Sequence, residues 1–300
     1  MKLLVLLSTY NGEVYLRQQL DSLLAQTLPG VEILVRDDGS HDGTCAILTE
    51  YANRGALKWY RGANLGAARS FWRLLADGGA ADYYAFCDQD DVWDSDKLAR
   101  AVAALEKAGA GPLLYGSDVR VAGADLSSLA PRMMGKSHTD YPHALVKNFA
   151  PGCTFVWNRA AMDLLRRYDA ARLGIDLHDW TAFQIVACLG RVVYDEAPSL
   201  SYRQHGGNAI GAVTHRAAHR LGQVAAFLYG EKRNSRQRNA RRLALAFGPE
   251  MTPENRLLTE DLAYYREDRL RQRRLLGRCG ALARGPEALA LRALIWLRRL

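Results

Sequence analysis

Short apolar segments of strand length alternate with amphipathic segments of helix length along the first ninety residues. The segments that begin with an apolar run and end in polar or turn-forming residues are 2–12, 31–40, 57–62 and 82–91. The segments with apolar residues at helical spacing are 14–26, 42–55 and 67–79. Strands that alternate with helices predict βαβ units around a largely parallel sheet.

The second half of the chain is less regular. Its patterned segments are 150–162 (a glycine turn, a strand and a helix), 177–190 (a helix) and 191–208 (two strands around Pro198, then a glycine-rich loop). From about residue 214 the pattern is helical and rich in arginine, with breaks at the Gly-Pro pairs 248–249 and 285–286. We therefore expect an α/β domain over residues 1–213 and a basic helical region over residues 214–300.

Charge is unevenly distributed between these two parts. The whole chain carries a formal net charge of +8, yet residues 215–300 contain 19 Lys and Arg against 8 Asp and Glu. The basic character therefore belongs to the C-terminal region, which we expect to meet a different partner from the rest. The five cysteines are scattered without a C-x-x-C pair, which argues against a disulfide framework or a thiolate zinc site.

The N-terminal segment is better interpreted as a first strand than as a signal peptide. Its apolar core is short, and no small-residue cleavage site follows it. No apolar run reaches the roughly 18 residues that a membrane-spanning helix requires. These features predict a cytoplasmic protein.

Polar residues gather where the predicted strands end. The clusters are residues 8–11, residues 37–38 and residues 88–91. In open α/β sheets, ligands bind beyond the carboxyl ends of the strands, so one shared site explains the three clusters together. The alternative is that Asp and Asn only initiate turns. That alternative suits "YNG" and "DDGS" but not "DQDD", which has no glycine or proline and whose charges repel each other.

Two carboxylates one residue apart at a strand end can hold a hard divalent cation. Mg²⁺ and Mn²⁺ prefer oxygen ligands, and Mg²⁺ commonly joins one or two carboxylates to substrate phosphates. A cation with its diphosphate would therefore balance the charges of Asp88 and Asp90. The sequence has neither a G-x-x-x-x-G-K-[ST] loop nor a G-x-G-x-x-G after the first strand, which argues against a P-loop nucleotidase and a dinucleotide-dependent oxidoreductase.

The order and spacing of these motifs resemble the family 2 glycosyltransferases, which have the GT-A fold, a Rossmann-like, mostly parallel sheet flanked by helices. The matching motifs are STYNG at Ser8, VRDDGSHDGT at Val35, NLG at Asn64, DQDDVW at Asp88, GCTFVWNR at Gly152, HDW at His178 and YRQHGGN at Tyr202. The last three are similar to the bacterial rhamnosyltransferase branch in particular. The resemblance covers roughly residues 1–212. Where that branch tends to carry Lys-Asn after the NLG motif, this chain has Arg69-Ser70, which keeps the positive charge but not the amide.

The resemblance implies a role for each motif. Ser8, Tyr10 and Asn11 would lie along the nucleotide, Asp38 would accept a hydrogen bond from a pyrimidine base, and Asp37 would shape that pocket. Asp88 would approach the ribose and the metal, Asp90 would be the main ligand of Mg²⁺ or Mn²⁺, and Asp91 would brace the loop. The expected nucleotide-sugar-binding residues are Ser8, Tyr10, Asn11, Asp37, Asp38, Asn64, Arg69, Asp88 and Arg203, and the expected metal ligands are Asp88, Asp90 and His205.

Asp179 of HDW matches the position of the family's catalytic base. Inverting sugar transfer needs one carboxylate to take the proton of the acceptor hydroxyl, and one metal to stabilise the leaving diphosphate. The alternative is an acid that interacts with a helix dipole. Arg203 and His205 could contact the diphosphate, His205 could instead complete the metal shell, and a polar loop without a ligand is the third option.

The implied reaction transfers a sugar from dTDP-rhamnose or a UDP-sugar to a cell-surface glycan or a lipid-linked acceptor. For the basic tail, docking on the inner face of the membrane and an ordinary solvated helical surface both remain open. Two other functions are weighed: a nucleotidyltransferase, for which the expected basic glycine-rich N-terminal loop is missing, and a nucleic-acid-binding protein. Because the tail lacks interleaved aromatic residues, no nucleic-acid partner is expected.

Overall fold

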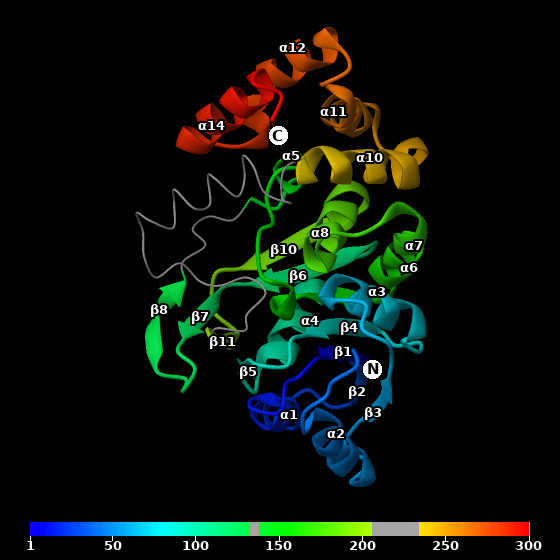
Figure 1. Cartoon of the computed structure of the whole chain (residues 1–300), viewed down its shortest axis with the longest axis vertical. Coiled ribbons are helices and arrows are strands. Elements are labelled where there is room, and N and C mark those ends of the chain that lie inside the picture. The colour runs from blue at the N-terminus through cyan, green and yellow to red at the C-terminus, as the bar shows by residue number, and fades with distance from the viewer. Residues whose placement is uncertain (133–137, 206–233, 300) are drawn as a thin grey trace.

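The computed structural model describes residues 1–132, 138–205 and 234–299. A seven-stranded sheet in the order β10-β6-β9-β4-β1-β2-β3 forms its centre (Figure 1). The strands are β1 (Leu3–Thr9), β2 (Val31–Asp37), β3 (Lys58–Arg61), β4 (Tyr83–Cys87), β6 (Leu113–Ser117), β9 (Val156–Asn158) and β10 (Arg191–Asp195). All neighbours pair in parallel except β9, which is antiparallel to both β4 and β6. The predicted largely parallel sheet is confirmed.

Helices cover both faces of this sheet. Strand β1 shows why, because its side chains alternate between two separate apolar clusters: Leu3, Val5 and Leu7 belong to one, and Leu4 and Leu6 to the other. The first cluster includes helices α1 (Leu16–Leu24), α2 (Thr44–Asn53) and α4 (Lys97–Ala108), and the second includes α3 (Ala67–Asp77), α6 (Arg159–Arg166) and α8 (His178–Leu189). A central parallel strand buried on both faces reads as a continuous apolar run, as residues 3–7 do.

A second, four-stranded sheet stands beside the acidic end of β4. Its order is β5-β11-β7-β8, with β5 at Val92–Trp93, β7 at Val119–Ala122, β8 at Ser128–Arg132 and β11 at Leu200–Arg203. Strand β11 pairs with β5, which follows the acidic loop directly, so Leu200 lies opposite Trp93. This pairing brings the chain after β11 back to residues 88–91.

The C-terminal helices pack onto the same core as α3, α6 and α8. They are α10 (Ser235–Phe247), η2 (Gly248–Glu250), α11 (Pro253–Tyr264), α12 (Arg269–Gly277), α13 (Cys279–Leu282) and α14 (Gly285–Trp296). The short helices α5 (Tyr141–Ala144) and α7 (Ala170–Leu173) precede them in the chain. Leu243, Phe247 and Ile295 join the apolar cluster of Leu4. Asp176 pairs with Arg238 at 2.7 Å and with Arg242 at 2.9 Å.

The two predicted Gly-Pro breaks are confirmed, since α10 ends before Gly248 and α14 starts at Gly285. The predicted glycine-rich loop after His205 and the first part of the basic tail, residues 206–233, lie outside the described residues. Among the helices that are described, none combines the length and the apolar character needed to cross a bilayer.

Candidate active site

Hydrogen bonds hold the loop after β1 against the loop after β2. The Asn11 backbone has a positive φ of 48°, and its N–H donates to Ser40 Oγ at 2.9 Å while its side-chain oxygen accepts from the His41 N–H. The Gly12 N–H donates to Thr44 Oγ1 at 2.8 Å. The Asn11 side chain therefore stabilises the loop itself, whereas Tyr10 is 45% exposed.

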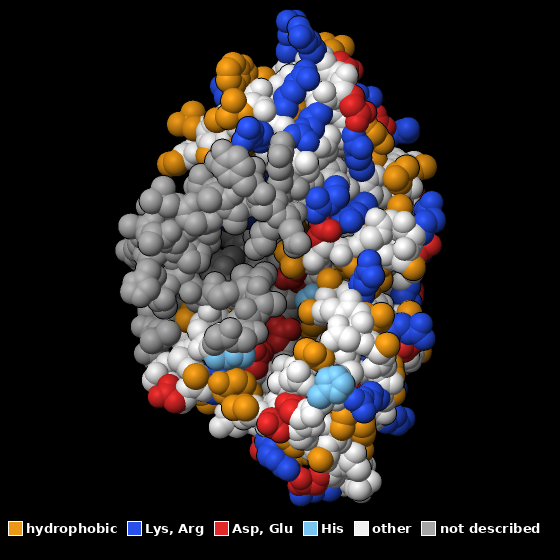
Figure 2. Space-filling view, in the orientation of Figure 1, with side chains coloured by type: hydrophobic (Ala, Val, Ile, Leu, Met, Phe, Trp, Pro, Cys, Tyr) orange, Lys and Arg blue, Asp and Glu red, His pale blue; other side chains and the backbone are white. Residues whose placement is uncertain are grey.

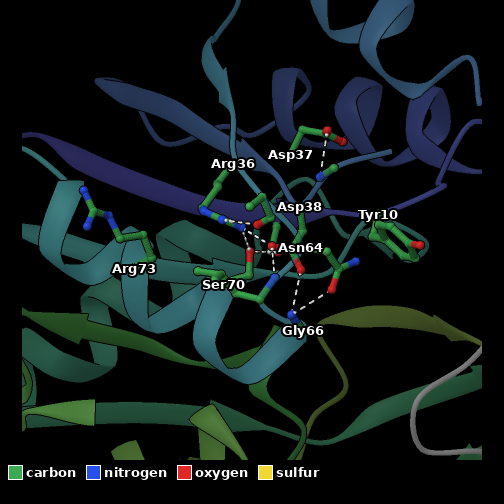
Figure 3. Close-up of polar contacts among 12 residues, drawn as sticks. Tyr10, Arg36, Asp37, Asp38, Asn64, Gly66, Ser70 and Arg73 are labelled. Atoms are coloured by element: carbon green, nitrogen blue, oxygen red, sulfur yellow. Dashed lines mark hydrogen bonds and ion pairs between the residues drawn. The ribbon is translucent and has the colours of Figure 1, made fainter. Parts of the chain in front are cut away.

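The loop after β3 is held by a buried ion pair. Asp38 pairs with Arg36 and accepts the backbone N–H groups of Leu65 and Gly66, both at 2.9 Å. Arg36 also donates to Ser70 Oγ at 2.9 Å, and Ser70 Oγ lies 2.6 Å from the Ser8 hydroxyl oxygen. Figure 3 shows Arg36 reaching between Asp38 and Ser70, while Arg73 points away from them.

The remaining residues expected along the nucleotide differ in exposure. Asp37 is fully buried and accepts from Ser40 N–H at 2.9 Å and from the Thr9 hydroxyl at 3.2 Å, which suits the expected pocket-shaping role. Asn64 and Arg69 are both exposed, and Asn64 Oδ1 also accepts the Gly66 N–H at 3.2 Å. The carboxylates of Asp37 and Asp38 are therefore buried and bound to other protein groups, whereas Tyr10, Asn64 and Arg69 are exposed to solvent.

Four carboxylates interact where β4 ends. Burial raises the pKa of Asp88 well above its usual range, and the charges of Asp91, Asp90 and Asp179 raise it further. Burial and the neighbouring Asp90 raise the pKa of Asp91 to about 7. Figure 2 shows acidic side chains gathered in the hollow at the middle of this face. The structure thus brings the expected base, Asp179, to the expected metal ligands from a helix about ninety residues further along the chain.

The chain after β11 closes this site from the other side. His205 Nε2 lies 2.8 Å from Asp90 Oδ2, and the His205 ring packs on Tyr15 with centroids 4.6 Å apart. Arg203 is 1% exposed; its Nε donates to the Asp90 carbonyl at 2.7 Å, and its guanidinium lies over the Tyr15 ring. Arg203 therefore braces the acidic loop in this arrangement, and its predicted contact with a diphosphate stays a prediction. The backbone N–H of Arg203 also donates to Asp91 Oδ1 at 3.1 Å.

Asp179 stands in the first turn of α8 with its carboxylate held from two sides. Asn148 Nδ2 donates to Oδ2 at 2.9 Å, and the Trp180 N–H donates to Oδ1 at 2.7 Å. A Cβ on Gly152 would lie 2.8 Å from the Cβ of Asp179 and 2.9 Å from His178 Nε2, so only glycine fits there. Asp179 is thus both an acid at a helix N-terminus and a carboxylate whose charge raises the pKa of Asp88.

The donor set at the acidic loop suits a hard divalent cation. Asp91 Oδ2 is buried and has no hydrogen-bond partner among the described residues, so this oxygen is available to a cation. The thiol of Cys153 lies with carboxylate oxygens of Asp88 and Asp91 in a group whose atoms are all within 4.8 Å. Burial raises the pKa of the Cys153 thiol well above its usual range. Because Mg²⁺ and Mn²⁺ prefer oxygen to sulfur, the carboxylate oxygens are the expected ligands.

A buried lysine lies behind the acidic loop. Lys97 is fully buried with its ammonium 3.9 Å from the centroid of the Trp93 ring, and burial lowers its pKa to about 8. Its charge interacts favourably with Asp91. Lys97 and the buried guanidinium of Arg203 together carry two positive charges against four carboxylates, so a net negative charge remains for a bound metal.

Sequence reasoning missed the residues that hold the site together. Each of them contacts a predicted site residue: Arg36 pairs with Asp38, Gln89 accepts a hydrogen bond from Tyr10, and Asn148 donates one to Asp179. A single polar residue in a segment carries no periodic signal, so only the position of Gln89 within DQDD could have drawn attention to it.

Comparison with known proteins gives consistent matches. The sequence model described as Glycosyl transferase family 2 matches residues 4–165. The dTDP-rhamnosyl transferase RfbG of Shigella flexneri is 30% identical over 232 residues, which span 73% of this chain and 78% of that protein. The glycosyltransferase alr2836 of Nostoc sp., whose name calls it uncharacterized, is 26% identical over 218 residues, 69% of this chain and 66% of that protein.

Solved structures share the fold. TarS 1–349 of S. aureus, crystallised with UDP-GlcNAc, superposes with a TM-score of 0.56 over 93% of this chain and 85% of that chain. Another crystal structure of TarS 1–349 of S. aureus gives a TM-score of 0.57 over 97% of this chain and 83% of that chain. Both are 17% identical to this chain, so the likeness is one of fold.

Proposed function

Because the chain belongs to glycosyl transferase family 2 and has its GT-A fold, we propose that it moves rhamnose from dTDP-rhamnose to a hydroxyl group of a cell-surface glycan or lipid-linked acceptor. That the chain is a glycosyltransferase using a nucleotide sugar follows from its family. The choice of rhamnose is supported by the 30% identical Shigella relative, whose name is dTDP-rhamnosyl transferase.

The meeting of Asp179 with the acidic loop carries the mechanistic proposal. Asp90 contacts His205 directly, and the charge of Asp179 acts on Asp88. Inverting transfer requires one base on the acceptor side and charge stabilisation on the diphosphate side, without a covalent intermediate. A carboxylate held by two hydrogen bonds, close to a cluster of carboxylates that can bind a cation, supplies both parts.

In this proposal Asp179 accepts the proton of the acceptor hydroxyl as that oxygen attacks the anomeric carbon. The bond between the anomeric carbon and the diphosphate oxygen breaks, and its electron pair leaves with the nucleoside diphosphate. Asn148 and the Trp180 N–H keep the carboxylate aimed during this step. Asp88, Asp90 and His205 would hold Mg²⁺ or Mn²⁺, which when bound supplies Lewis-acid stabilisation to the departing diphosphate.

Turnover of dTDP-rhamnose, UDP-glucose and GDP-mannose, measured as release of the nucleoside diphosphate with Mn²⁺ or with EDTA, tests the proposal. We expect dTDP-rhamnose with metal to be preferred. Asp90→Ala should abolish metal-stimulated turnover, whereas the control Asp96→Ala, an exposed residue in the same segment, should leave it unchanged. Asp179→Asn should keep donor binding and lose about 10²- to 10⁴-fold in kcat. Normal turnover by Asp90→Ala in EDTA would refute the metal proposal.

We extend the proposal to a membrane surface at the C-terminal helices. Helix α14 buries Leu291 and Ile295 against the core, but it exposes Leu289 by 70% and Trp296 by 68%. These two side chains and Arg292 line a shallow cavity of about 450 Å³. Figure 2 shows Lys and Arg gathered at this end of the molecule. Exposed apolar side chains beside arginine suit the interface of an anionic bilayer.

Co-sedimentation with vesicles tests this surface. The protein should bind vesicles that contain phosphatidylglycerol more than vesicles of phosphatidylcholine alone. Replacing Leu289 and Trp296 with serine should weaken binding, while Leu245→Ser, a 63% exposed leucine of α10, should not. Point substitutions are better than truncation, because removing α14 would open the core at Ile295. Equal sedimentation of all three proteins would refute docking through α14.

A further inference from the structure

Gln89 joins two loops whose functions were predicted separately. Its side-chain oxygen accepts the Tyr10 N–H at 2.8 Å, and its side-chain nitrogen donates to the Tyr10 carbonyl at 3.0 Å. One carboxamide thus satisfies both backbone groups of one residue, as a neighbouring strand would. Tyr10 and Gln89 are 79 positions apart in the sequence.

The contact has a close steric fit on its other side. A Cβ on Gly12 would lie 2.3 Å from Gln89 Oε1 and 2.6 Å from its Cδ, so a side chain there would displace the carboxamide. The Gly12 N–H itself is fixed to Thr44 Oγ1, which prevents the backbone from moving aside freely. Glycine at position 12 and glutamine at position 89 are therefore matched.

The neighbours of Gln89 give this contact its meaning. Gln89 stands between Asp88 and Asp90, the two carboxylates proposed to hold the cation, and Asp90 reaches His205 while Gln89 reaches Tyr10. The exposed Tyr10 ring belongs to the loop proposed to lie along the nucleotide. Any shift of the acidic loop is thus transmitted to the Tyr10 backbone through two hydrogen bonds.

We propose that Gln89 is a positioning residue that couples the cation site to the nucleotide site by fixing the register of the Tyr10 loop against the acidic loop. This inference rests on the proposed function, because it requires a metal and a nucleoside diphosphate at this site. Coupling between two ligands is a free energy shared by both, so each ligand raises the affinity of the other by the same factor.

Binding measurements on the full chain test the coupling without turnover. Isothermal titration gives the Kd of dTDP with and without Mn²⁺, and electron paramagnetic resonance gives the Kd of Mn²⁺ alone. In Gln89→Met, which keeps the length of the side chain but loses both polar contacts, the enhancement of dTDP affinity by Mn²⁺ should fall about 30-fold, the worth of two ordinary hydrogen bonds. The Kd of Mn²⁺ alone should change by less than about threefold, because Asp88 and Asp90 remain.

Gly12→Ala provides a second route to the same defect. It displaces the Gln89 carboxamide without changing a polar group, so it should lower the same enhancement. Both changes break the same contact between Gln89 and Tyr10. The double variant should therefore lose no more of the Mn²⁺ enhancement than the more impaired of the two single variants, a clear departure from additivity. The control is Gly79→Ala, where a Cβ has no atom within 4 Å, and it should behave as the wild type.

The outcomes separate the inference from the function beneath it. Wild-type enhancement in both Gln89→Met and Gly12→Ala would overturn the coupling role of Gln89. An equal loss of affinity for Mn²⁺ alone and for dTDP alone would also overturn it, because it would indicate general damage to the site. Failure of the wild-type protein to bind dTDP or UDP with Mn²⁺ would refute the proposed function itself.

Discussion

Replacing Arg36 with methionine should destabilise the whole domain and not only the nucleotide pocket. Both members of the Arg36–Asp38 pair have side chains that are 3% exposed, so the variant leaves a carboxylate buried without its cation. Removing one partner of a buried ion pair costs about 3–5 kcal/mol. Asp38 keeps the N–H groups of Leu65 and Gly66, which favours the lower end, and we expect about 3 kcal/mol at pH 7.

Urea unfolding followed by circular dichroism measures this loss as a shift in midpoint at constant slope. Adding Asp38→Asn to Arg36→Met should recover part of the stability, since the unpaired buried charge is then removed. The control Arg54→Met breaks an exposed pair with Glu50 and should stay close to the wild type. A loss below about 1 kcal/mol for Arg36→Met, with unchanged slope, would refute the view that this pair holds the Asn64–Gly66 loop.

Three further predictions concern the base, the metal and pH. Asn148→Ala should lower kcat about 10- to 100-fold with donor KM within twofold, since Asp179 loses one of its two holding contacts; an unchanged kcat in steady-state assays would contradict this. Adding Mn²⁺ should raise the melting temperature of the wild type but not of Asp90→Ala, as measured by calorimetry.

Burial opposes ionisation of Asp176, but hydrogen bonds from Arg242 and Arg238 lower its pKa overall. As the pH falls, the Asp176 carboxylate is therefore protonated in the unfolded state before it is protonated in the folded state. The stabilisation by its ion pairs is present above about pH 4 and is lost as the pH falls through the lowered pKa. The stability gap between the wild type and Asp176→Asn should close below that pH in urea titrations.

Most of the main sheet could be predicted from local sequence. Residues 3–7 are apolar at every position because β1 is buried on both faces, and the flanking helices repeat with helical spacing. Asp37 ends β2, and Asp38, Asp88 and Asp90 follow strand ends, so these positions predict one shared site, because parallel strands end at one edge. The sequence also predicted the helix that carries Asp179.

The partners of these residues were decided only by the tertiary structure. Asp90 meets His205 because β11 pairs with β5, and Asp179 meets Asn148 because α8 packs beside η1 (Gly152–Thr154) and the segment before it. The two hydrogen bonds between Gln89 and Tyr10 likewise join residues that are distant in the chain. A hydrogen bond depends on distance and angle within a few tenths of an ångström, and no periodicity in a linear sequence encodes which two distant side chains will satisfy it. The pattern of hydrophobic and polar residues therefore predicted where the candidate site lies, and tertiary packing determined which contacts hold its residues.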